Sequence, residues 1–185
     1  MKPTPTLLGS AGLALLLNLN VNAATLSIIP NASTVQPGAS IAFTVFADDI
    51  LEGTPLDGGG LSVLFDSTLL EITSVALAAP WLSLSPPVIN NTQGKITDIA
   101  FGIFTIGFSG NGIALLNFTA KTLALGNSDI IVNVDPNNPF VSGIDELVLN
   151  PNTTSASVSA VPVPAAGVFF LTGLLGLSRC FRQTL

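Results

Sequence analysis

The sequence predicts an all-β domain, a β-sandwich or jelly roll of about nine strands, flanked by a signal helix and a transmembrane helix. Three observations predict this domain, two of them its all-β class and the third its sandwich architecture. Short alternating or β-branched segments recur between residues 24 and 150, and Gly, Pro, Asn and Asp separate them. No stretch in that region repeats apolar residues at helical spacing over several turns. Strand and loop lengths vary too much for a regular up-and-down barrel, which favours a sandwich.

The expected strands of the first half differ in residue type. The first is short and ends at the turn residues Pro30 and Asn31. The second is β-branched and aromatic, as in a buried strand, and the third alternates so that one face meets the core. A polar loop separates these two, and Asp66 precedes a turn before the fourth. The four strands cover residues 25–29, 41–46, 61–66 and 70–77.

In the second half, residues 112–123 alternate most clearly, with Leu116, Phe118 and Ala120 on one face. The sequence Gly110-Asn111-Gly112 predicts a tight turn before them. After residue 150 the composition shifts towards Asn, Thr, Ser and Ala, which predicts a flexible polar linker over residues 151–160, with pairing of its first part as a last strand as the alternative. The other strands are expected at residues 95–104, 129–134 and 144–149, so the sandwich covers 24–150.

Residues 1–23 are predicted to be an export signal. Lys2 supplies the positive start, residues 7–19 are apolar, and small residues precede a cleavage site between Ala23 and Ala24. The apolar run is short for a bilayer span, which favours removal over anchoring.

Residues 161–185 combine a Pro/Ala motif, an uncharged apolar run and a short basic end. The run from Val161 to Leu177 would, as a helix, nearly span a hydrocarbon core of about 30 Å. Arg179 and Arg182 would then hold its end on the cytoplasmic side. The two apolar ends therefore predict that the acidic domain between them lies outside the cell, membrane-anchored or released.

The order of these pieces resembles a sorting tail of the PEP-CTERM class, most closely its Val-Pro-Leu-Pro-Ala variant. The motif here is Val161, Pro162, Val163, Pro164 and Ala165, so Val163 stands where that variant has Leu. The resemblance implies that an exosortase-like membrane transpeptidase cuts at or near the motif. The alternative is an uncleaved membrane anchor, because motifs of this kind are loosely specific.

The charge of the domain excludes one class of partner. All eleven carboxylates lie between residues 24 and 160, where only Lys95 and Lys121 oppose them, so the formal charge is −9. Such a surface repels phosphate backbones, and no nucleic-acid binding is expected.

The residue types also argue against an enzyme. The chain has no histidine, which removes Ser-His-Asp and Cys-His arrangements and His-ligated metals. Cys180, the only cysteine, lies in the tail, so the domain has no disulfide. The run Gly58-Gly59-Gly60 lacks the Lys and helix of a phosphate loop.

Two features of the domain suggest ligands. Asp48, Asp49, Glu52 and Asp57 offer hard oxygens for calcium, although their spacing matches no EF-hand and a solvated acidic turn is the alternative. Trp81 either stacks on a sugar ring or plugs one end of the sandwich.

Several segments resemble a cohesin domain across about residues 25–158. Residues 35–40 lead into the second strand, 60–66 are followed by Leu69-Leu70-Glu71-Ile72, and 94–96 and 113–121 fit the same pattern. The resemblance implies a jelly-roll binding module whose relatives in cellulase complexes dock calcium-loaded dockerin modules. No docking residue is carried over, because shape and not a signature defines that face.

These expectations combine into a non-enzymatic surface or matrix protein, sorted by an exosortase-like enzyme, that contacts a dockerin-like module or an exopolysaccharide. The competing hypothesis is a structural envelope or biofilm protein that self-associates and is simply anchored by its C-terminal helix.

Overall fold

The alternating segments of the sequence become strands. The computed structural model describes residues 24–143, 145–146 and 154–161, and these contain strands and no helix. In chain order the strands are β1 (Thr25–Pro30), β2 (Thr34–Val35), β3 (Ser40–Asp48), β4 (Gly58–Leu64), β5 (Leu70–Leu77), β6 (Leu82–Ser85), β7 (Val88–Asn90), β8 (Lys95–Gly102), β9 (Ile113–Thr122), β10 (Gly126–Val134), β11 (Val141–Ser142), β12 (Asp145–Glu146) and β13 (Thr154–Ala160).

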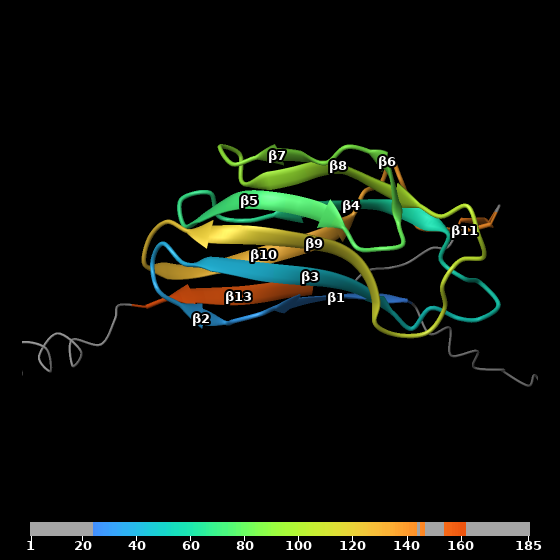
Figure 1. Ribbon diagram of the computed structural model, residues 1–185, viewed down its shortest axis with the longest axis horizontal. Coiled ribbons are helices and arrows are strands. Elements are labelled where there is room, and N and C mark those ends of the chain that lie inside the picture. Colours follow the sequence, from blue (N-terminus) through green and yellow to red (C-terminus); the bar gives the residue numbers. More distant parts are fainter. Residues whose placement is uncertain (1–23, 144, 147–153, 162–185) are drawn as a thin grey trace, which may run out of the picture.

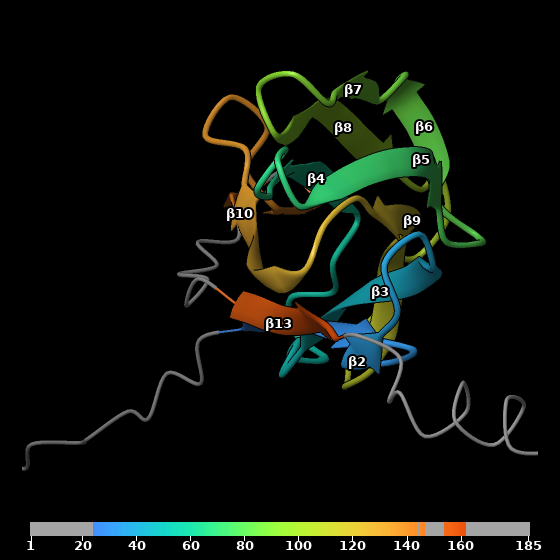
Figure 2. The same ribbon diagram turned by 90° about the vertical axis from the view of Figure 1, so that its left-hand side faces the viewer.

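The strands form two sheets that pack face to face (Figures 1 and 2). The smaller sheet has the order β1-β3-β9-β5, and its neighbours are antiparallel. The larger sheet follows β12-β11-β4-β10-β13-β2, with β8 paired to β4, and β6 and β7 paired to β8. Among the described pairs, β13–β2 alone is parallel. The expected all-β sandwich is therefore confirmed.

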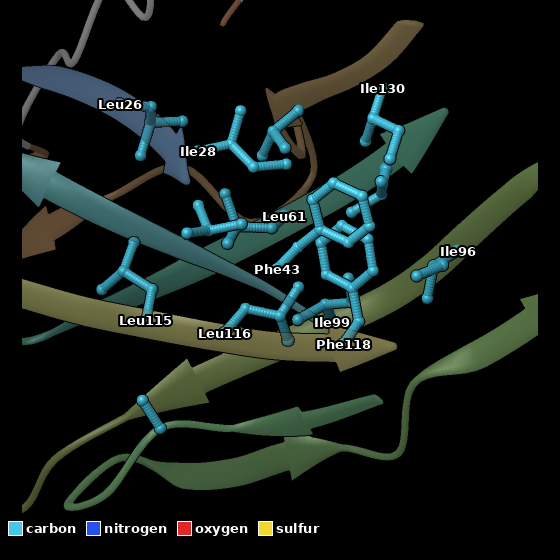
Figure 3. Packing of buried hydrophobic residues seen from close by; sticks show 14 of the residues in the cluster. Leu26, Ile28, Phe43, Leu61, Ile96, Ile99, Leu115, Leu116, Phe118 and Ile130 are labelled. Atoms are coloured by element: carbon cyan, nitrogen blue, oxygen red, sulfur yellow. The ribbon is translucent and has the colours of Figure 1, made fainter. Parts of the chain in front are cut away.

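The core lies between the two sheets. Phe43 of β3 and Phe118 of β9 stack with ring centroids 4.9 Å apart. Leu61 of β4 and Ile130 of β10 are fully buried and come from the larger sheet (Figure 3). Burial of each such side chain contributes about 1.5–3 kcal/mol relative to exposure. The predicted alternation of β9 is confirmed, because Phe118 and Ala120 are buried whereas Asn117 and Lys121 are exposed.

The glycine-rich start of β4 is explained by packing. The ring of Phe140 is buried against Gly59, where an added Cβ would lie 2.4 Å from the Phe140 Cδ1 atom. Phe140 then meets Phe101 edge-on, with ring centroids 5.4 Å apart. Gly59 therefore creates the space that one large core residue occupies.

The expected linker at residues 151–160 is wrong over 154–160, which form β13. This strand pairs with β10 from Gly126↔Ala160 to Val132↔Thr154, and its last two residues pair with β2. Its Ser, Thr and Ala residues give it the composition of a linker, but ladder hydrogen bonds need only backbone groups. Without β13, β10 would become an edge strand that pairs only with β4.

Other expected boundaries shift or lie outside the described residues. Within the strand expected at 144–149, the described residues Asp145 and Glu146 form the short β12, paired with β11, and the others lie outside the described residues. The expected loop before residue 61 ends at Gly58, where β4 begins. The predicted signal at 1–23 and the apolar tail from 162 onward lie outside the described residues. Within the described ranges, no helical segment has the length and hydropathy of a membrane span.

Candidate functional site

A groove of about 700 Å³ opens on the outer face of the larger sheet. Its floor comes from β4 and β8, where Gly58 pairs with Gly102 and Ala100 lies further along β8. Side chains alternate along a strand, so these small residues face away from the core-facing Ile99 and Phe101. The face is hollow here because its floor positions carry little or no side chain.

Exposed apolar side chains form one wall and rim of the groove. Leu84 of β6 lies over Gly102, where an added Cβ would meet the Leu84 Cδ1 atom at 3.2 Å. Leu84 is 60 % exposed, and Phe104, just after β8, is 83 % exposed. Ile106, two residues beyond, is 88 % exposed. Large apolar side chains exposed to this degree beside a groove are typical of an interaction site.

The loop from Asp135 to Phe140 forms the opposite wall and packs onto β4. The Gly60 N–H donates to the Asn138 carbonyl at 2.8 Å, and the Asp135 N–H donates to the Gly60 carbonyl at 2.9 Å. A Cβ at Gly60 would lie 2.6 Å from the Asn138 Cβ, so glycine permits this approach. Asn137, Asn138 and Pro139 therefore line the groove.

The carboxylate of Asp135 orders this loop. It accepts hydrogen bonds from the Asn137 N–H and from the Asn138 side-chain amide, each at 3.0 Å. The Asn137 backbone bond, and after it the Asn138 amide bond, hold the pKa of Asp135 below its usual value.

Among the lining residues, which all belong to the described part of the chain, the two charged side chains are acidic: Asp57 and Asp98. The Asp57 carboxylate accepts a hydrogen bond from the Gly143 N–H. Asp98 has a φ of 58° at an irregularity in the β4–β8 ladder, a conformation uncommon for residues other than glycine. The groove thus combines an apolar rim with negative charge, which suits a partner that offers apolar and cationic side chains.

The structure does not bring the four predicted calcium residues together. Asp48 and Asp49 lie at the end of β3, Glu52 lies in the exposed loop that follows, and Asp57 lies beside β4 and bonds Gly143. Nowhere in the described ranges do three or more His, Cys, Asp or Glu side chains gather as a metal site. The carboxylates are separated because β3 and β4 belong to different sheets.

Trp81 plugs one end of the sandwich and does not present a ring face for sugar stacking. It is only 6 % exposed, and its ring meets Phe101 and Phe108 edge-on at 5.0 and 5.2 Å between centroids. Its Nε1–H donates to the Ala114 carbonyl at 2.8 Å. Of the two roles left open by the sequence, the structure selects the plug.

Two residues of the predicted processing sites are described, and both lie at the ends of the described domain. Ala24 is buried directly before β1, and Val161 is partly exposed directly after β13. The other predicted residues lie outside the described ranges: Ala23, Pro162, Val163, Pro164, Ala165, Arg179 and Arg182.

Sequence reasoning missed the groove. Its floor depends on the pairing of β4 with β8, and its far wall comes from the loop after β10, so no local motif contains it. The run Gly58-Gly59-Gly60 was the available signal, because consecutive glycines in a strand mark close approach of other groups.

No protein-family model matches the chain, and no curated protein matches its sequence. The fold, however, is similar to that of cohesin modules. The third cohesin of ScaC from Acetivibrio cellulolyticus, solved in complex with the ScaB dockerin, has a TM-score of 0.59 at 10 % identity, covering 75 % of this chain and 99 % of that one. A non-cellulosomal cohesin from the archaeon Archaeoglobus fulgidus has a TM-score of 0.56 at 15 % identity, covering 78 % and 97 %.

A type II cohesin module from the ScaA scaffoldin of Acetivibrio cellulolyticus is similar to the same extent, with a TM-score of 0.59 at 11 % identity, over 77 % of this chain and 99 % of that module. At these identities the likeness is one of fold. The expected cohesin-like sandwich is confirmed.

Proposed function

We propose that this chain is an exported, non-enzymatic binding protein whose sandwich captures a protein partner in the groove between Leu84, Phe104 and the loop at Asn138. The observation that carries the proposal is the exposed apolar rim around a floor of glycine and alanine. When a partner covers exposed apolar side chains, their burial lowers the free energy of the complex by roughly 25 cal/mol per Å².

A dockerin-like module is the partner class that the comparison favours. The ScaC cohesin with this fold was solved in complex with a dockerin. An exopolysaccharide is the other partner considered. It is less well supported, because Trp81 is buried in the end plug and unavailable to a sugar ring.

The proposed delivery follows from the two ends of the sequence. Residues 1–23 direct export, and an exosortase-like transpeptidase then acts at Val161 to Ala165 while Arg179 and Arg182 stay on the cytoplasmic side. The module ends up on the cell surface or is released. Mass spectrometry of the mature C-terminus tests this step: a product that ends within residues 161–165 supports sorting, and a C-terminus that retains Arg182 in the membrane fraction supports simple anchoring.

Binding by immobilised full-length protein tests the groove. The probes are a calcium-loaded dockerin module and a soluble exopolysaccharide. The change Phe104→Ser removes an exposed rim side chain at little cost to the core, and should weaken dockerin binding by about 2 kcal/mol, roughly thirtyfold in Kd.

The matched control is Ile29→Ser, which removes an exposed side chain (57 %) from β1 in the other sheet and should leave binding unchanged. Saturable dockerin capture that Phe104→Ser weakens supports the proposal. Self-association without capture of either probe supports the structural alternative, and polysaccharide capture alone would replace the proposed partner class.

A further inference from the structure

The turn between β8 and β9 holds an Asn-Gly pair in contact with two acidic residues. The Gly112 N–H donates to the Asp48 Oδ1 atom at 2.6 Å. The Asn111 Oδ1 atom accepts a hydrogen bond from the Asp49 N–H, also at 2.6 Å. Both Asn111 and Gly112 are exposed, so water reaches them.

We propose that Asn111 is a site of spontaneous deamidation that the fold itself promotes. The Gly112 nitrogen attacks the Asn111 Cγ atom while the Asp48 carboxylate takes the Gly112 N–H proton. The negative charge that develops on Oδ1 is stabilised by the Asp49 N–H. The Cγ–Nδ2 bond then breaks, and the proton held by Asp48 leaves with Nδ2 as ammonia.

The product of this step is a cyclic imide between residues 111 and 112. Water adds to one of its two carbonyls and the corresponding C–N bond opens. Opening at Cγ yields aspartate, and opening at the backbone carbonyl yields isoaspartate, in which the chain continues through the side chain. The net reaction consumes one water and releases one ammonia.

Asn111 differs from the other asparagines of the domain in sequence and in setting. It is the only asparagine of the chain that glycine follows. An added Cβ at Gly112 would have no atom within 4 Å, so the turn is open to solvent on the side of the Gly112 Cα atom. Asn117 of β9 and Asn127 of β10 lie instead in ladders, where pairing with neighbouring strands fixes the backbone.

The modification would act on the loop that carries the groove rim. This loop runs from Ile103 to Gly112. Backbone hydrogen bonds join it to the loop between β3 and β4, two between Ile50 and Gly110 and two between Leu56 and Phe108. A new carboxylate at position 111 would repel Asp48 and Asp49 at the end of this loop. Isoaspartate would also lengthen the backbone and displace the Gly112 N–H from Asp48.

Peptide mapping of the purified full-length chain in detergent tests the proposal. One sample is kept folded and another is kept in guanidinium chloride at the same pH and temperature. Trypsin cleaves after Lys95 and Lys121 and releases peptide 96–121, which contains both Asn111 and Asn117. Fragmentation mass spectrometry then locates the deamidation and distinguishes aspartate from isoaspartate.

The expected result is conversion of Asn111 several-fold faster in the folded than in the denatured sample, with Asn117 unchanged in the folded one. Asp48→Asn should lower the folded rate and leave the denatured rate as it was, whereas Asp129→Asn, on β10, should change neither. Equal or slower conversion in the folded sample, or no effect of Asp48→Asn, would overturn the proposal. If Trp81 fluorescence shows that Asp48→Asn is unfolded, the folded and denatured wild-type rates decide.

Discussion

A single side chain, Asn91, protects the exposed edge of the smaller sheet. β5 is the last strand of that sheet, and its Ile72 would otherwise present unpaired backbone groups. The Asn91 Oδ1 atom accepts from the Ile72 N–H at 2.8 Å, and the Asn91 amide donates to the Ile72 carbonyl at 3.0 Å. Asn91 follows β7 of the larger sheet, so it imitates a neighbouring strand and links the two sheets.

We expect Asn91→Ala to lower the free energy of unfolding by about 1–3 kcal/mol, because two partly buried backbone groups lose their partner. Guanidinium unfolding followed by the fluorescence of the buried Trp81 measures the loss. The matched control is Gln93→Ala in the same turn, which loses only an exposed bond to Asn90 and should stay within about 0.5 kcal/mol of wild type. Equal losses in the two variants would contradict this role for Asn91.

At the scale of elements, β13 determines whether β10 is covered. We expect a chain that ends at residue 153 to lose its cooperative thermal transition and to aggregate, because β10 becomes an open edge beside the core residue Ile130. A chain that ends at residue 161 retains β13 and should melt cooperatively. Circular dichroism and size-exclusion chromatography distinguish the two. A folded, monomeric shorter chain would restore the linker interpretation of residues 154–160.

The loop after β10 should respond to acid through Asp135. Its hydrogen bonds stabilise the carboxylate and lower its folded pKa below the usual value near 3.8. The stabilisation is therefore present above the unfolded pKa and is lost as the pH falls through the lower folded pKa. We expect the Asn137 amide resonance in NMR spectra to titrate with a midpoint below 3.8. Asp135→Asn should remove that titration. A wild-type midpoint at or above the usual value would contradict the stabilisation of the Asp135 carboxylate by its hydrogen bonds.

Elements with strong local patterns could be predicted from the sequence, and those that depend on distant partners could not. β3 and β9 are long and alternate or are β-branched, so their pattern identified them. β2 has two residues and exists because β13 lies beside it. The placement of two candidate ligand residues depended on distant contacts in the same way. Asp48 ends a strand of the smaller sheet whereas Asp57 precedes a strand of the larger one, and the packing of Trp81 against Phe101 is not visible in either segment.

At the scale of the whole molecule, charge is distributed unevenly. The domain between residues 24 and 160 has a formal charge of −9. Its two lysines lie away from the groove lining: Lys121 is on β9, directly opposite Glu71 of β5, and Lys95 begins β8. Asp57 and Asp98 therefore face the groove without a cationic neighbour in its lining, and the field there attracts a cationic partner.

We therefore expect a cationic partner to bind faster at low salt, because added salt shortens the screening length from about 10 Å at 0.1 M to about 3 Å at 1 M. Asp98→Asn should slow association several-fold with little effect on folding, since asparagine tolerates the positive φ at this position. The matched control Glu71→Gln removes one charge from the opposite sheet and should change association much less. Surface plasmon resonance at several salt concentrations separates the association and dissociation rates. Association that is independent of salt, or equally slowed by both variants, would show that the acidic groove does not guide the partner and that the apolar rim alone determines binding.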